Sequence, residues 1–281
     1  MVPDGLNYII DNKYGNVNLP DIKGNSQLTV KYGNLNAGNF YGNTNTFDIK
    51  YGNMDIDMIT KGINNIDVKY GNMKSKGITD GINNVVDIKY GDLRMDKISG
   101  KTNMNLEYNG YVNLKETGDI TVSIKYSKMS IEYGRNLEID SKYSKIGIGK
   151  ISGLRLISKH DDYDFGEIDN LNAECSYTDL TIDRLVKSLN VTGIQHGKIE
   201  VDHVSAGFDF IKADASYTDI VLTFDPDSSY DFKAYTKYGK IKTPTSNINT
   251  NNEGMQITGN VGGSSKSKID IKNNYGDIIL K

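Results

Sequence analysis

Residues 44–73 read TNTFDIKYGNMDIDMITKGINNIDVKYGNM, and this stretch contains the string KYGN twice, around Tyr51 and around Tyr70. The same string recurs unaltered around Tyr14 and Tyr32, becomes KYGD at Tyr90, degenerates further along the chain, and returns as KYGK at Tyr238 and NYGD at Tyr275. A repeat of about 20 residues is typical of one coil of a solenoid and is short for a helical repeat. The chain is therefore expected to wind the same short unit many times.

The tyrosine of this string serves as an anchor position that can be followed through 15 copies between residues 14 and 275, spaced 17 to 21 residues apart. His160, His196 and Thr258 take its place in three copies, and a degenerate copy stands at Tyr108. The repeat predicts about 15 rungs. The tyrosines expected to stack as a structural ladder are Tyr14, Tyr32, Tyr51, Tyr70, Tyr90, Tyr126, Tyr143, Tyr177, Tyr217, Tyr238 and Tyr275.

Apolar and polar residues alternate on both sides of the anchor. Leu28 and Phe47 stand four residues before it, and Leu35 and Met54 stand three residues after it. Period-two alternation indicates strands with one buried face, and its parity changes across the Gly-Asn pair that follows the anchor. We expect the glycine to supply the positive φ of a corner and the anchor to share the buried side of the preceding strand.

Each rung is thus predicted to be a strand, a corner, a second strand and a looser return segment such as residues 58–65. Stacked rungs of this kind form an all-β, single-stranded parallel β-helix, a β-solenoid, which we expect to be one domain over residues 1–281.

Charged residues form two columns on the outer face of the first strand. Lys50 and Lys69 directly precede the anchor, and Asp48 and Asp67 lie two residues earlier on the same face. Acidic and basic columns side by side neutralise each other, and each exposed pair contributes only a few tenths of a kcal/mol. The columns are predicted to be a solvated face, so the inward apolar residues must supply the stability.

Composition excludes several function classes. The net charge is −3, only four arginines occur and no basic tract is present, so nucleic acid is not an expected partner. No run of about 18 apolar residues could form a membrane-spanning helix, and the first residues lack the basic and apolar regions of an export signal. Cys175 is the one cysteine, and no nucleotide-binding or metal-binding motif is found, so no cofactor and no metal site are expected.

The densest cluster of ionisable side chains is His160, Asp161, Asp162 and Asp164. Clustered carboxylates act as general acids and bases or as calcium ligands in β-helical polysaccharide lyases and hydrolases. Because the cluster falls on a corner, where polar residues are expected anyway, the structural interpretation is favoured. These four residues are catalytic candidates only if the protein is an enzyme.

The tyrosine column also allows two interpretations. Its rings either pack on one another and hold the register of the rungs, or they lie exposed as a surface on which sugar rings could stack. The parity of the anchor favours packing.

The KYGN rungs, the segment LTFDPDSSYDFKAYTKYGKI (222–241) and the segment SKIDIKNNYGDIIL (267–280) resemble a bacterial β-solenoid family labelled "putative adhesin". In that family, a Pro-x-Ser-Ser motif followed by alternating residues marks the last few coils. The resemblance implies a right-handed parallel β-helix outside the cytoplasm, in the periplasm, on the outer membrane surface or secreted. It implies no active site.

Three functions follow as hypotheses. The favoured one is a non-catalytic surface scaffold that binds a surface glycan or a protein weakly at many equivalent points. The second is a pectin-lyase-like enzyme in which Asp161, Asp162 and Asp164 carry out the chemistry. The third is a structural element that associates end to end, because the terminal rungs 8–19 and 269–281 are expected to present open strand edges.

Overall fold

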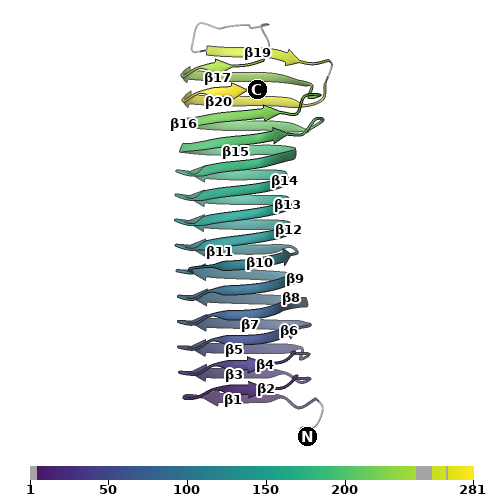
Figure 1. The fold of residues 1–281 in the computed structure, drawn as a ribbon, viewed down its shortest axis with the longest axis vertical. Helices are drawn as coiled ribbons and strands as arrows, with labels where there is room; N and C mark the ends of the chain where they lie inside the picture. Colours follow the sequence, from purple (N-terminus) through teal and green to yellow (C-terminus); the bar gives the residue numbers. More distant parts are fainter. Residues whose placement is uncertain (1–4, 245–254, 264) are drawn as a thin grey trace. The chain divides into compact units, whose positions relative to one another are not determined.

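In a computed structural model the protein is all-β, and its parallel strands stack as a β-solenoid, which confirms the predicted fold class (Figure 1). The structure describes residues 5–244, 255–263 and 265–281. It divides into two compact units, Met1–Glu138 and Ile139–Lys281, which are described separately below as unit 1 and unit 2. That the chain forms one domain stays a prediction.

In unit 1 the strand before each corner pairs with the same strand of the next rung, and so does the strand after it. Equivalent positions of the repeat face each other, as in the pairs Leu28↔Phe47 and Met54↔Met73. The strands are β1 (Tyr8–Asn12), β2 (Val17–Leu19), β3 (Ser26–Lys31), β4 (Leu35–Ala37), β5 (Thr44–Lys50), β6 (Met54–Ile59), β7 (Gly62–Lys69), β8 (Met73–Lys89), β9 (Leu93–Glu107), β10 (Val112–Thr117), β11 (Ile120–Lys125) and β12 (Lys128–Lys142), of which residues 139–142 belong to unit 2.

The apolar residues of both strands fill the interior, as the alternation predicts. Leu28 and Val30 before the corner and Leu35 after it are fully buried, and their equivalents in later rungs are too. This burial stabilises the rungs by about 1.5–3 kcal/mol for each large apolar side chain. The core of each rung therefore lies between its two strands.

The anchor differs from the expectation in both its conformation and its direction. Tyr32, Tyr51 and Tyr70 have φ of 55°, 57° and 57°, so the left-handed residue of the corner is the tyrosine. This conformation reverses the parity of the strand and turns the ring outward, where about half of it is exposed. The prediction that the anchor shares the buried side was wrong.

The positive φ predicted for the glycine after the anchor is found at Gly15 and Gly276, with 97° and 120°, but not at the inner corners of unit 1. Gly52 and Gly71 do not have positive φ. A Cβ on Gly71 would lie 1.8 Å from the carbonyl oxygen of Gly52 in the preceding rung, and Gly52 stands in the same relation to Gly33. Glycine is required here because successive corners approach too closely for any side chain.

A buried polar ladder runs through the interior of unit 1. The amide of Asn45 donates to Oδ1 of Asn64 at 2.8 Å, and that of Asn64 donates to Oδ1 of Asn84 at 2.8 Å. Ser26 and Thr102 complete the ladder at its two ends, at 2.9 Å each. The return segment 58–65, expected to be loose, thus contains a buried strand residue that fixes the register.

Unit 2 contains the remaining strands, which follow the same rung pattern up to β16. They are β13 (Lys145–Lys159), β14 (Asp162–Ser176), β15 (Asp179–Val204), β16 (Phe210–Phe224), β17 (Tyr230–Tyr238), β18 (Ile241–Lys242), β19 (Met255–Val261), β20 (Lys268–Tyr275) and β21 (Ile278–Leu280).

Beyond β16 the strands no longer stack in chain order. β16 pairs with β20 and β21, which in turn pair with β17 and β18, so the later segment lies between two earlier ones (Figure 1). β19 pairs antiparallel with β17, where Thr258 faces Lys233 instead of occupying an anchor position. The expectation that residues 269–281 form an open terminal edge was therefore wrong.

The number and the order of the turns both differ from the prediction. The structure has about 11 turns, counted over both units, where the sequence predicted about 15 rungs. In unit 2 the rings stack in chain order from Tyr143 to Tyr217 and then in the order Tyr275, Tyr238. The order differs because the segments around Tyr238 and Tyr275 carry equally good rung patterns, and these patterns do not specify which neighbour each rung takes.

We expect Gly71→Ala to lower the free energy of unfolding of unit 1 by about 1–3 kcal/mol, because the new methyl group overlaps a backbone oxygen. Urea denaturation followed by circular dichroism measures this. Gly118→Ala is the matched control, since its Cβ would have no neighbour nearer than 3.6 Å, and it should leave stability unchanged or slightly raised. Equal losses for both variants would contradict the close-approach explanation.

Asn64→Ala should lower the free energy of unfolding of unit 1 by about 1–3 kcal/mol or more, because it leaves an amide N–H of Asn45 and Oδ1 of Asn84 buried without partners. Asn36→Ala is the control. Asn36 donates to Asn18 at 2.9 Å in an exposed ladder, where water can replace the lost bond. Thermal denaturation of the two variants side by side checks the difference, and similar melting temperatures would show that the buried ladder is dispensable.

Candidate functional site

The most regular surface feature is a stack of seven rings in unit 1, which we call the tyrosine ladder: Tyr14, Tyr32, Tyr51, Tyr70, Tyr90, Tyr108 and Tyr126. From Tyr32 onward, neighbouring ring centroids lie 4.9–5.0 Å apart and the ring planes are within 5° of parallel. The first pair is looser, at 5.6 Å and 19°. The ladder includes Tyr108, whose copy of the repeat is degenerate in sequence.

The backbone positions the rings from Tyr32 to Tyr126, whose tyrosines are left-handed, whereas Tyr14 is not. The left-handed tyrosine keeps its N–H in the hydrogen-bond pattern between rungs, as Tyr51 donates to the carbonyl of Lys69 at 3.0 Å and Tyr70 to that of Lys89 at 3.0 Å. A left-handed conformation costs a non-glycine residue about 1–2 kcal/mol. Stacking of each ring on its neighbours offsets part of that cost.

Stacking determines which part of the ring a partner can reach. The side chains from Tyr32 to Tyr126 are 45–52% exposed, yet each ring between Tyr32 and Tyr108 has a neighbour on both faces. The exposed parts are therefore the ring edges and the hydroxyl groups. Sugar rings cannot stack on the faces of these inner tyrosines, so the ladder offers a row of hydroxyls about 5 Å apart.

Burial against its neighbours raises the pKa of the Tyr108 hydroxyl, and the phenolates that Tyr126 and Tyr90 would form raise it further. The Tyr108 hydroxyl therefore stays protonated at neutral pH and can donate a hydrogen bond.

The ladder is flanked by residues that largely satisfy one another. On one side the predicted acid–base columns are confirmed for Lys50 with Asp48 at 3.1 Å and for Lys69 with Asp67 at 2.7 Å. Lys89 instead pairs with Glu107 of the next rung at 3.0 Å, and that bond raises the pKa of Lys89. The flank is thus close to neutral.

On the other side of the ladder, Asn34 and Asn53, which stand two residues after their anchors, link successive rungs. Oδ1 of Asn34 accepts the backbone N–H of Asn53 at 2.8 Å, and Oδ1 of Asn53 accepts that of Asn72 at 2.9 Å. These bonds fix the corners, so the ladder is supported by a rigid backbone.

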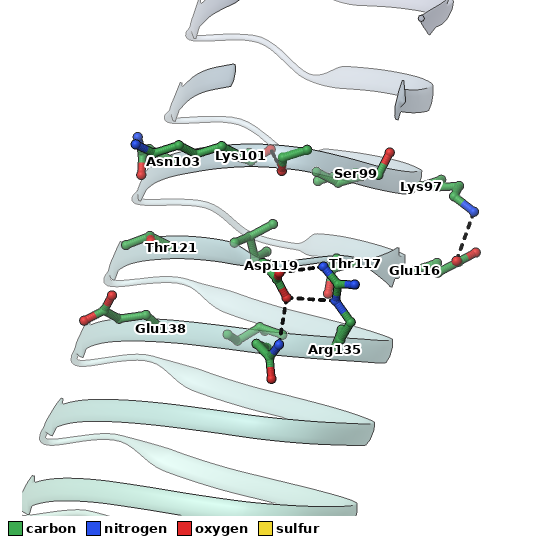
Figure 2. Close-up of a pocket in the computed structure, with 17 residues that line it drawn as sticks. Lys97, Ser99, Lys101, Asn103, Glu116, Thr117, Asp119, Thr121, Arg135 and Glu138 are labelled. Carbon is green, nitrogen blue, oxygen red and sulfur yellow. Dashed lines mark hydrogen bonds and ion pairs between the residues drawn. The ribbon is translucent and has the colours of Figure 1, made fainter. Parts of the chain in front are cut away.

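A groove of about 720 Å³ lies elsewhere in unit 1, lined by residues 97–103, 116–121 and 135–138 of three successive rungs (Figure 2). It forms where Gly118 and Asp119 alone connect β10 to β11, whereas β9 runs continuously through the equivalent region. The sequence analysis missed this site, and its only sequence signal is a short return segment.

Four charged side chains of the groove form two ion pairs. Lys97 contacts Glu116 at 3.0 Å, and Arg135 contacts both carboxylate oxygens of Asp119 (Figure 2). The amide of Asn136 also donates to Asp119, and these bonds lower the pKa of the Asp119 carboxyl. The groove can form polar contacts with a ligand, but these pairs leave neither carboxylate poised as a general acid or base.

The predicted cluster at residues 160–164 in unit 2 does not converge. His160 is stacked between Tyr143 at 4.9 Å and Tyr177 at 4.7 Å, so it occupies a ring position of the corner. Asp161 points into the interior, whereas Asp162 and Asp164 lie on the exposed face of β14, where Asp164 is 3.5 Å from Lys145. Adjacent residues of an extended strand point in opposite directions, which separates the side chains.

Asp161 is the acceptor at the centre of a buried network and is only 2% exposed. Its Oδ1 accepts the N–H of Ser144 at 2.7 Å. Its Oδ2 accepts the hydroxyls of Ser141 and Ser158 at 2.7 Å each and the N–H of Lys159 at 2.9 Å. This carboxylate therefore holds three segments of neighbouring rungs together and cannot reach a substrate in this structure.

Two more polar groups lie next to this network. The Tyr163 hydroxyl is 2.6 Å from Ser141 Oγ, and burial raises its pKa well above the usual range. Burial, together with the Asp161 charge, raises the pKa of the Cys175 thiol to about 12. Within the described ranges 5–244, 255–263 and 265–281, no group of three or more His, Cys, Asp or Glu side chains could hold a metal ion.

Asp161→Asn should lower the stability of unit 2 by about 1–3 kcal/mol, because either orientation of the amide places an NH₂ group against a backbone N–H donor. Asp162→Asn on the exposed face is the control and should change stability by less than about 0.5 kcal/mol.

Labelling of Cys175 by a thiol reagent at pH 8 during urea denaturation measures the effect. In the folded protein the thiol is buried and protonated, so labelling reports the opening of unit 2. If Asp161→Asn and Asp162→Asn gave the same urea midpoint, the structural role of Asp161 would be refuted.

The part of the chain that the structure describes contains no helix that could span a membrane. Comparisons of the chain with protein-family models, with curated proteins and with solved structures find no match. The resemblance of the KYGN rungs to the adhesin family stays a prediction.

Proposed function

We propose that the protein is a non-catalytic scaffold that presents the tyrosine ladder as a repeated binding edge at the bacterial cell envelope or surface. The single observation that supports this most is the regular spacing of the ladder, 4.9–5.0 Å between neighbouring rings over six consecutive tyrosines. A surface that repeats one contact at a fixed interval suits a partner that is itself extended and repetitive.

Each rung offers only a weak contact by itself. One tyrosine hydroxyl can donate one hydrogen bond, and such a bond contributes about 0.5–1.5 kcal/mol net. Rungs that engage the same polymer convert later contacts into intramolecular ones, so the overall affinity can far exceed that of a single contact. A surface glycan with hydroxyl and carbonyl acceptors, or an extended protein segment, has the chemistry that this row of donors requires.

The neutral flank shapes the expected binding. Lys50, Lys69 and Lys89 beside the ladder are paired with Asp48, Asp67 and Glu107, so these three lysines provide little attraction for a polyanion. Binding through hydroxyls should therefore depend only weakly on salt, in contrast with a basic surface. The extracytoplasmic location and the adhesive role belong to the same proposal and are supported by the resemblance of the KYGN rungs.

The alternative, a pectin-lyase-like enzyme using Asp161, Asp162 and Asp164, gains no support from the described residues. The first of these carboxylates is buried and fully engaged, and the other two are on the opposite face of the strand. The groove between residues 97 and 138 has paired charges.

Replacing tyrosines by phenylalanine tests the proposal, because phenylalanine keeps the stacked ring and removes only the hydroxyl. Tyr70→Phe alone should weaken binding to a glycan-array ligand by less than about twofold, whereas Phe at Tyr32, Tyr51, Tyr70, Tyr90 and Tyr108 together should weaken it by more than about tenfold. Glycan arrays identify the ligand, and surface-based binding measurements at two salt concentrations give the affinities.

The control combines Tyr111→Phe and Tyr133→Phe, two exposed tyrosines of unit 1 outside the ladder, and should bind like the unaltered protein. Loss of binding from the single Tyr70→Phe variant would indicate one specific pocket in place of a repeated edge. Release of reducing or unsaturated sugars by the unaltered protein would refute a non-catalytic role.

A further inference from the structure

The segment of residues 267–281 forms a complete rung in unit 2 that is inserted between two earlier parts of the chain. β20 pairs with β16 on one side and β17 on the other, as in Ile271 with both Ala213 and Ala234. β21 likewise pairs with β16 and β18 (Figure 1). We call the space that this segment fills between β16 and β17–β18 the insertion slot.

The segment is held in the slot by the same contacts that hold any other rung. Ile269, Ile271, Ile278 and Leu280 are buried. The ring of Tyr275 is stacked between Tyr217 at 4.4 Å and Tyr238 at 4.8 Å.

Polar contacts specify the register of the segment. The amide of Asn273, which is itself buried, donates to the carbonyl of Thr218 at 2.6 Å. The hydroxyl of Ser267 donates to the carbonyl of Phe208. Backbone N–H groups add bonds on both sides, from Gly276 to Tyr238 at 3.1 Å and from Lys281 to Leu222 at 2.9 Å. The slot thus recognises both the apolar pattern and the polar positions of this sequence.

The slot is built entirely by residues that precede the segment in the chain. Only residues 225–229 connect β16 to β17, yet β20 lies between these two strands and bonds to both. Because a chain is synthesised from its N-terminus, residues 210–242 exist before the strand that separates them. Until it arrives, the facing edges of β16 and β17 are unpaired and can accept any strand of the right pattern.

We propose that the insertion slot of one copy accepts residues 267–281 of a second copy, so that two chains are joined by exchanged rungs. The second copy is the occupant that fits, because its segment brings the identical apolar residues, the identical Asn273 and the identical Tyr275. Exchange of identical elements creates no new type of contact and costs little free energy, which is the usual basis of domain swapping. This inference does not depend on the proposed binding function.

Cysteine trapping in the full-length chain tests the exchange. Lys212 and Asp270 are exposed and directly opposite each other on β16 and β20, within disulfide reach for neighbouring strands. Two differently tagged chains, one with Lys212→Cys and the other with Asp270→Cys, are co-expressed, purified through both tags and oxidised mildly. Cys175 does not interfere, because it is buried and its pKa is about 12.

We expect a covalent dimer of the two tagged chains, with the 212–270 bridge identified by peptide mapping. Its yield should be at least about tenfold higher than that of a control pair carrying Lys212→Cys and Lys233→Cys. Each slot is formed by β16 and β17 of one chain, so position 212 of one copy and position 233 of the other lie in different slots. Even within one chain, positions 212 and 233 face opposite sides of Asp270 and are two strand spacings apart, about 9.6 Å, beyond disulfide reach.

A chain carrying both Lys212→Cys and Asp270→Cys shows whether the 212–270 disulfide can form. In this chain the disulfide should form either within the folded monomer or between exchanged copies. If this chain forms the bridge but the two-tag purification yields no mixed species, or a mixed species without the 212–270 bridge, the exchange is refuted. If a different polypeptide is purified with the chain and the double variant forms no bridge, the slot has another occupant, and the proposal of a second copy fails.

Discussion

Every part of this structure depends on one constraint: a residue in a rung lies about 4.8 Å from its equivalent in the next rung, so each side chain must be compatible with a copy of itself. Apolar residues meet this condition inside, as with Met54 beside Met73. Asparagine meets it because its side chain both donates and accepts, as Asn64 does in the buried ladder. Tyrosine meets it by stacking. Glycine occupies the corner positions where the backbone of the neighbouring rung leaves no space for a side chain.

The same constraint explains what could be predicted from the sequence. Burial of positions such as Leu28 and Leu35 is a local property of alternating strands, so the sequence revealed it. The left-handed residue of the corner could have been the glycine or the tyrosine, and only the backbone distinguishes them. The order of the last rungs was unpredictable because the segments around Tyr238 and Tyr275 have nearly the same pattern. Residues 160–164 form a cluster in the sequence, but adjacent residues of a strand point in opposite directions, so their side chains are separated in space.

The stacking of each residue on its own equivalent also limits the kinds of functional site that the fold can form. Catalysis by carboxylates requires unlike groups to converge, with one acid and one base held at different pKa values. A regular solenoid places like groups beside like groups, and a row of equal carboxylates repels itself unless lysines intervene, as Lys69 does beside Asp67. What the repeat produces readily is a row of identical weak contacts. Because stacking occupies the faces of the tyrosine rings, those contacts are hydroxyl groups and ring edges.

The two breaks in the repeat have different consequences. The short return at Gly118 and Asp119 opens a groove but leaves its charges paired, so it changes the local shape more than the chemistry. The insertion of β20 and β21 changes the connectivity. In a solenoid, stability is approximately a sum of contacts between adjacent rungs, and that sum is the same whether a rung belongs to the same chain or to another. A rung supplied by a second copy would therefore be held as firmly as the chain's own. Two linked copies would also carry two tyrosine ladders, which raises the number of weak contacts available to one extended partner.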